Sequence, residues 1–182
     1  MDNICSDAHS ARRGILFDDM LIAGGGCGWG GMPERLLEAI QAAGTQDLTF
    51  ASNNAGIDNE GIGKMLRRTG GGPAVAEGKE VKRVDGEDHV LEQGIFADLA
   101  IIKGWTADES GNLIVRKTVR NCNHPVATAG RGCIAEGEEI VSVGSLDPDA
   151  IHLPGIYVNR LIPGAPYDKT VEQRTVRERE AA

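Results

Sequence analysis

A glycine-rich loop is the segment of this sequence best suited to chemistry. Residues 24–31 read Gly-Gly-Gly-Cys-Gly-Trp-Gly-Gly, between a short apolar run and the acidic start of a helix. Backbone N–H groups in such a loop, at a helix N-terminus, can donate hydrogen bonds to a ligand's oxygens. The same geometry also serves simply to pack a helix close to a sheet, and the loop alone does not decide between these uses.

The loop also matches a dinucleotide fingerprint in part. Gly26-x-Gly28-x-x-Gly31 has the required spacing between a strand and a helix. The fingerprint expects an acidic residue at the end of the next strand, about 20 positions on. Asp47 instead begins that strand, and Pro33 removes a donor from the helix start. A nicotinamide or flavin site is therefore the weaker interpretation.

Two amide side chains follow the second predicted strand, residues 47–51. Asn53 and Asn54 lie at the edge where α/β proteins place their sites. Their amides could donate to a substrate carboxylate, or they could cap and close a turn.

The cysteines and histidines do not form a metal motif. Cys5, Cys27, Cys122 and Cys133 have irregular spacings and no CxxC pair, whereas a zinc site needs about four ligands. We expect no metal and reduced thiols. Cys27 is either a reactive thiol at a helix start or an inert packing residue. His124 and His152 have no obvious acid–base partner and are expected to be structural.

Composition excludes several function classes. The net charge of -8 argues against nucleic acid as a main partner. No apolar run approaches the roughly 18 residues of a membrane span. The first residues are polar and acidic, unlike a signal peptide, so we expect a cytoplasmic protein.

The hydrophobic pattern predicts an α/β fold. Residues 20–23, 33–43 and 47–51 form a strand–loop–helix–strand unit that is typical of a parallel sheet. We predict one domain over residues 1–165 and a charged tail over 166–182. The remaining predicted elements are a helix at 60–68, a hairpin of strands 80–84 and 89–92, and strands at 97–103, 112–116, 132–143 and 156–162.

Several blocks together resemble the A-type chains of 3-oxoacid CoA-transferases. Residues 18–34 resemble that family's glycine signature, 52–58 its Ser-Asn-Asn-Ala-Gly turn, and 146–158 a third landmark. The likeness covers nearly the whole chain and looks closest to the succinyl-CoA:3-oxoacid branch. The chain departs from the pattern at Cys27 and Cys122, each in place of a Phe. A block of several dozen residues is also missing near Thr69.

The resemblance implies a reduced three-layer α/β/α fold with an open, mainly parallel sheet, similar to NagB and RpiA. It implies a hetero-oligomer with a B-type subunit, expected to be a heterotetramer, that moves CoA between small carboxylic acids without a permanently bound cofactor. The nucleophilic glutamate lies in that partner's Ser-Glu-Asn-Gly motif, which is absent here, so no catalytic residue is expected in this chain. A non-catalytic binding subunit is the alternative. The expected CoA-binding residues are Gly25, Gly26, Cys27, Gly28, Trp29, Gly30 and Gly31, with Asn53 and Asn54 toward the substrate.

Overall fold

The main sheet of this protein is mainly parallel, as the sequence predicts. The computed structural model describes residues 3–27, 30–53, 80–90 and 94–164. Five strands run parallel in the order β2-β1-β5-β7-β8, and β6 pairs antiparallel with the end of β5. Their bounds are β1 (Leu21–Gly24), β2 (Thr49–Ser52), β5 (Ala97–Asp108), β6 (Leu113–Ile114), β7 (Gly130–Val141) and β8 (Arg160–Pro163).

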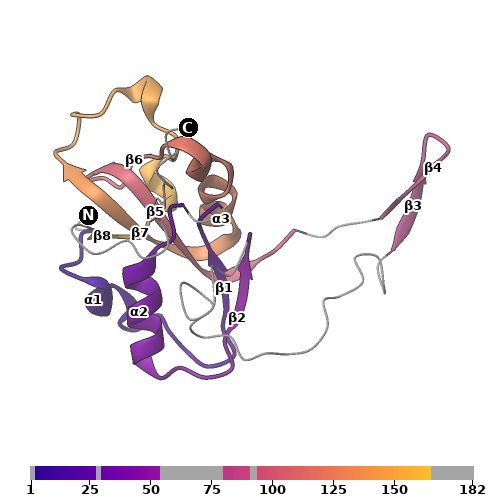
Figure 1. Ribbon diagram of the computed structural model, residues 1–182, viewed down its shortest axis with the longest axis horizontal. Coiled ribbons are helices and arrows are strands. Elements are labelled where there is room, and N and C mark those ends of the chain that lie inside the picture. The colour runs from indigo at the N-terminus through magenta and orange to yellow at the C-terminus, as the bar shows by residue number, and fades with distance from the viewer. Residues whose placement is uncertain (1–2, 28–29, 54–79, 91–93, 165–182) are drawn as a thin grey trace, which may run out of the picture.

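Helices cover both faces of this sheet (Figure 1). On one face, α1 (Ala8–Arg12) and α2 (Glu34–Ala43) share a core with Ile22, Leu99 and Ile134. On the other, α3 (Asn123–Ala129) packs near a second core made largely of small side chains. Because successive strand residues point to opposite faces, the aliphatic strands β1, β5 and β7 supply both cores. No helix in the described part of the chain is long and apolar enough to cross a membrane.

The predicted strand–loop–helix–strand unit is confirmed. Leu36, Leu37 and Ile40 form the buried stripe of α2, while Glu38 and Gln41 face solvent. The helix ends where the sequence predicts, because Gly44 adopts the left-handed conformation at φ 72°. The carboxyl ends of β1 and β2 therefore lie together on one edge of the sheet, with the glycine loop leaving β1.

The predicted hairpin is also confirmed, as strands β3 (Val81–Val84) and β4 (Glu87–Val90) of a separate two-stranded sheet. Asp85 and Gly86 both have positive φ, 51° and 87°. Asp-Gly at the centre of a two-residue turn matches the right-handed twist of the flanking strands. The turn is shorter than the predicted four residues, so β4 begins at Glu87 rather than His89.

The sequence pattern places the last strand too early. Residues 155–157 form the 3-10 turn η4 (Gly155–Tyr157), and β8 begins only at Arg160. Gly155 lies too close to the backbone of Ser110 and Asn112 for a side chain, and its N–H donates to Asn112 Oδ1. These contacts between distant parts of the sequence override the apolar run.

Other differences concern short helical segments. Helices α1 and α3 and the 3-10 turns η2 (Lys117–Asn121) and η3 (Pro148–Ala150) are not predicted from the sequence, since segments this short carry little periodicity. The predicted helix at 60–68 and the tail at 166–182 lie outside the described residues. The single domain over residues 1–165 stays a prediction.

Close contact between β5 and β7 requires glycine at position 130. A Cβ on Gly130 would lie 2.5 Å from the Ala100 nitrogen and 2.8 Å from its Cβ. We therefore expect Gly130→Ala to lower the free energy of unfolding by about 1–3 kcal/mol, through overpacking. On the same strand, a Cβ on Gly132 meets only Asn159 Oδ1, at 3.5 Å. Gly132→Ala is the matched control, expected to be neutral or stabilising in urea unfolding; equal losses in both variants would contradict this account.

Candidate functional site

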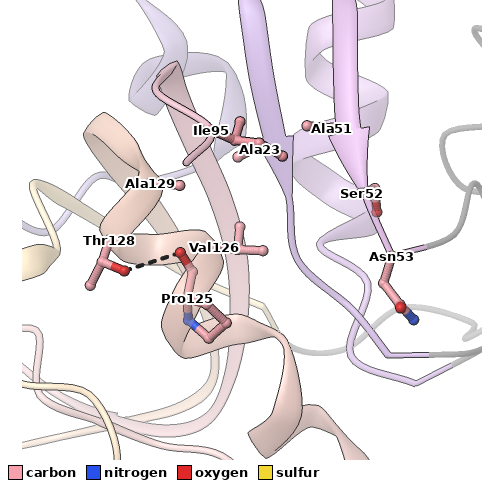
Figure 2. A pocket seen from close by; sticks show the side chains of 9 residues that line it. All are labelled: Ala23, Ala51, Ser52, Asn53, Ile95, Pro125, Val126, Thr128 and Ala129. Carbon is pink, nitrogen blue, oxygen red and sulfur yellow. Dashed lines mark hydrogen bonds between the residues drawn. The ribbon is translucent and has the colours of Figure 1, made fainter. Parts of the chain in front are cut away.

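A pocket of about 460 Å³ opens on the α3 side of the sheet beside β1 and β2. Figure 2 shows the end of β2 on one side and α3 on the other. The pocket has the volume of a small-molecule site and lies where α/β proteins place theirs. Its walls are mainly apolar, with three polar side chains: Ala23, Ala51, Ser52, Asn53, Ile95, Pro125, Val126, Thr128 and Ala129.

The polar side chains of the pocket differ in whether they are free to hydrogen-bond to a ligand. Ser52 Oγ donates to the Gly24 carbonyl at 3.0 Å, and Thr128 Oγ1 donates to the Pro125 carbonyl at 3.0 Å. Asn53 is exposed, and its side chain has no hydrogen-bond partner among the described residues. Of the two predicted substrate residues, Asn53 therefore lines the pocket with its amide available, while Asn54 lies outside the described residues.

The glycine loop uses its own amides to hold its shape. Gly25 N donates to the Ile101 carbonyl at 2.7 Å, and Gly26 N donates to Asn123 Oδ1 at 3.0 Å. Cys27 and Gly30 exchange backbone hydrogen bonds at 3.0 and 3.3 Å. A ligand that needed any of these four N–H groups would have to displace an existing acceptor. Of the remaining predicted loop residues, Gly31 is buried beneath Val119, and Gly28 and Trp29 lie outside the described part.

Asn123 holds the beginning of this loop in place through side-chain hydrogen bonds, a role that the sequence did not predict. Its side chain is 1% exposed. While Oδ1 accepts from Gly26 N, Nδ2 donates to the Lys103 carbonyl on β5. A Cβ at Gly25 would lie 2.2 Å from Asn123 Oδ1. The loop can therefore approach α3 this closely only because residue 25 is glycine.

Glu136 fastens the end of the loop. Pro33, the N-cap of α2, makes no side-chain capping bond. Glu136 on β7 supplies one instead, because its Oε1 accepts from Leu36 N at 2.8 Å. A carboxylate at this position interacts favourably with the positive end of the helix dipole. The helix N-terminus that the sequence offers to a ligand's oxygens is thus occupied by the protein's own carboxylate.

The environment of Glu136 disfavours the ionised form of its carboxyl group. The side chain is fully buried, and Oε2 has no hydrogen-bond partner in the described part of the chain. Burial raises the pKa of Glu136 to about 7, even though the Leu36 hydrogen bond and the nearby Lys103 and Arg35 charges lower it. Desolvation is therefore the largest effect at this site.

A row of charges leads from Glu136 toward the surface. Lys103, only 2% exposed, pairs with Glu138 at 3.6 Å. Glu138 also accepts from Arg116 at 3.2 Å. The Arg116 guanidinium lies 5.0 Å from the centre of the Trp105 ring, within the range of a cation–π contact. Each buried charge in this row thus has a neighbour of opposite sign, as buried charges require.

The histidines have structural contacts. His152 Nδ1 accepts from Val115 N at 3.3 Å, and burial lowers the pKa of this imidazole, which favours its neutral form. The ring of His124 lies edge-on to Tyr157 at 6.3 Å. Within residues 3–27, 30–53, 80–90 and 94–164, no group of three His, Cys, Asp or Glu side chains is arranged to hold a metal.

Comparison with known proteins relates this chain to one protein family. Residues 60–163 match the family model described as Coenzyme A transferase. The chain is 39% identical to the A-type chain of the succinyl-CoA:3-ketoacid coenzyme A transferase of Xanthomonas campestris pv. campestris, covering 95% of this chain and 93% of that protein. It is 32% identical to the mitochondrial succinyl-CoA:3-ketoacid coenzyme A transferase 2A of Rattus norvegicus, covering 95% of this chain but 47% of that one.

A solved structure shares the fold. Glutaconate coenzyme A-transferase from Acidaminococcus fermentans superposes with a TM-score of 0.65 at 15% identity, covering 92% of this chain and 77% of that one.

The bacterial alignment also measures a length difference. Its 226 aligned positions hold about 173 residues of this chain, which is 95% of 182, so about 53 positions are filled only in the relative. This agrees with the missing block of several dozen residues that the sequence suggests. The position expected for that block, near Thr69, lies outside the described residues.

The raised pKa of Glu136 predicts a pH-dependent stability. Because the folded pKa, about 7, exceeds the ordinary 4.5, the folded state holds this proton more tightly than the unfolded state. The resulting stability is present below pH 4.5 and is lost as the pH rises through 7, a change of roughly 3 kcal/mol. We expect Glu136→Gln to remove that part of the dependence, measured as the free energy of unfolding in urea between pH 4 and pH 8. Glu139→Gln, at an exposed position of the same strand, is the control. A Glu136→Gln profile parallel to that of the wild type would show that this carboxyl does not titrate as described.

Proposed function

Because this chain belongs to the coenzyme A transferase family, we propose that it is the A-type member of a heteromeric enzyme that moves CoA from succinyl-CoA, or another acyl-CoA, to a 3-oxoacid such as acetoacetate. The observation that carries this proposal is the 39% identity to the A-type chain of a bacterial succinyl-CoA:3-ketoacid coenzyme A transferase, over 95% of this chain. The chain is a CoA-transferase subunit; its substrates, its partner and its site residues are the subject of the proposal.

The proposed chemistry is covalent catalysis by a carboxylate on the partner subunit. That glutamate attacks the thioester carbonyl of the acyl-CoA, expels the CoA thiolate and forms a mixed anhydride. The thiolate then attacks the glutamyl carbonyl, which releases the first acid and leaves a glutamyl-CoA thioester. The second acid takes the CoA by the reverse of these steps. Glu136 is unsuited to this role, because it is fully buried and caps α2.

This chain would supply the binding surface for that reaction. We assign the acid to the pocket between β2 and α3, with the Asn53 amide as a donor to its carboxylate and Asn54 beside it. The loop residues Gly25, Gly26, Cys27, Gly28, Trp29, Gly30 and Gly31 form the surface against CoA. Since four loop amides already have acceptors, we propose that the loop contributes mainly shape, with close approach made possible by its glycines.

The length of the Rattus norvegicus relative supports the need for a partner. This chain aligns with 47% of the Rattus norvegicus protein, so about half of that protein has no counterpart here. We propose that a separate B-type subunit provides that half, in a heterotetramer. Neither chain would then have activity alone.

A second candidate is a non-catalytic binding subunit. It is favoured by the roughly 53 aligned positions at which this chain has no residue. A nicotinamide or flavin site has less support. Strand β2 ends at Ser52 rather than at an acidic residue, and Asp47 lies before the strand, exposed to solvent.

Co-expression with a B-type subunit tests the proposal. We expect a copurifying complex that transfers CoA from succinyl-CoA to acetoacetate only when both chains are present. In that complex Val126→Trp, which fills the pocket, should lower kcat/KM for the acid at least about tenfold, the equivalent of 1.4 kcal/mol. Val143→Trp, on an exposed side chain outside the pocket, is the matched control.

Each failure has a distinct meaning. A stable but inactive complex would establish the non-catalytic subunit instead. Absence of any complex would contradict both candidates. Full activity of the Val126→Trp complex would remove the pocket from the substrate site.

A further inference from the structure

Two half-buried cysteines from distant parts of the sequence meet at the glycine loop. Cys27 follows Gly26, Cys122 precedes Asn123, and Gly26 N donates to Asn123 Oδ1 at 3.0 Å, which brings the two segments together. The neighbouring Cys27 side chain is, after burial, a cause of the raised pKa of the Cys122 thiol. The two cysteines thus flank the same contact between the loop and α3, although 95 positions separate them in the sequence.

The other two cysteines are placed differently. Cys133 is buried in the core on the α3 face, and burial raises its pKa to about 12, so its thiol is inert. Cys5 packs against the core on the opposite face of the sheet. Cys27 and Cys122 are thus the pair that the fold itself brings into contact.

We propose that Cys27 and Cys122 form a reversible disulfide by exchange with a low-molecular-weight disulfide such as oxidised glutathione. The bond would join the glycine loop covalently to the start of α3. Both are positions at which this sequence has Cys where the resembling family has Phe. The bond's effect on catalysis rests on the proposed function, whereas its formation does not.

The exchange proceeds in two balanced steps. Burial and the neighbouring Cys27 side chain raise the pKa of the Cys122 thiol, so we assign Cys122 the second step. In the first step Cys27 gives its proton to solvent, and its thiolate displaces one glutathione thiolate and forms a mixed disulfide. In the second step Cys122 gives its proton to solvent, and its thiolate attacks the Cys27 sulfur and releases the second glutathione. The protein loses two electrons and two protons, and the oxidant gains both as two thiols.

The proximity of the two cysteines favours the second step over reduction of the mixed disulfide by free glutathione. A neighbouring thiol reacts intramolecularly, at an effective concentration far above that of free glutathione. The bond is expected to be reversible, because both cysteines are half-buried and therefore accessible to a reductant in solution.

Tryptic mapping can test the proposal, because the four cysteines fall on four different peptides. Cleavage after Lys and Arg gives residues 1–12, 14–35, 121–131 and 132–160, each with one cysteine. The full chain would be incubated with oxidised glutathione, alkylated and digested without reduction. We expect a cross-linked pair of peptides 14–35 and 121–131, lost after dithiothreitol and absent from the Cys27→Ser and Cys122→Ser variants. The Cys5→Ser and Cys133→Ser variants should retain it.

Two results would overturn the proposal. One is stable glutathione on Cys27 or Cys122 without the cross-link. The other is a predominant disulfide that includes Cys5 or Cys133.

Activity of the two-chain complex gives a separate measurement. We expect oxidation to lower CoA transfer at least fivefold and dithiothreitol to restore it, with no such change in Cys122→Ser. A cross-link that leaves activity unchanged would contradict a role of this bond in the site. A reduced complex without any transfer would count against the proposed function, while the peptide map would still decide whether the disulfide forms.

Discussion

The carboxylate of Glu136 beneath the N-terminus of α2 is the interaction on which the site depends. Its hydrogen bond to Leu36 N supplies the cap that Pro33 does not, and so fixes where the helix begins. A charge-assisted hydrogen bond contributes about 1.5–3 kcal/mol, and the helix dipole up to about 2 kcal/mol more. The raised pKa shows that desolvation outweighs both. The ionised carboxylate thus positions the helix at some expense of stability at neutral pH.

Asn123 completes this arrangement at the other end of the loop. Asn123, from α3, accepts a hydrogen bond from Gly26 N, and Glu136, from β7, accepts one from Leu36 N. The two side chains thus fix the chain at Gly26 and at Leu36. The loop's internal hydrogen bonds then fix the backbone at Cys27 and Gly30. If ligands bind at these described positions, as we propose, the restrained backbone lowers the entropic cost of binding.

The sequence predicted those features that depend on local pattern. The apolar run before the loop, the stripe of Leu36, Leu37 and Ile40, and Gly44 were enough for β1, α2 and the end of that helix. The Asp-Gly turn identified the hairpin. The prediction was wrong for the start of β8, because contacts of Gly155 with residues 110–112 decide the conformation there.

The two residues that hold the loop were not predicted, because their roles arise from contacts across 97 and 100 sequence positions. No periodicity marks Asn123. Glu136 gave a weak signal, since it is an acidic residue after Cys133, Ile134 and Ala135 in a strand that is otherwise buried there. An unpaired charge in such a strand needs a partner, but the sequence alone does not say that the partner is a helix N-terminus.

Amide hydrogen exchange at Gly26 and Leu36 tests most directly whether these two side chains hold the loop. The account predicts slow exchange of both amides in the wild-type chain. Asn123→Ala should accelerate exchange at Gly26 at least about tenfold, equivalent to 1.4 kcal/mol of local opening, and Glu136→Ala should do the same at Leu36. Asn121→Ala, at an exposed position, should change neither. Unchanged exchange at both amides in the two variants would show that the loop is held by other contacts and would contradict the account.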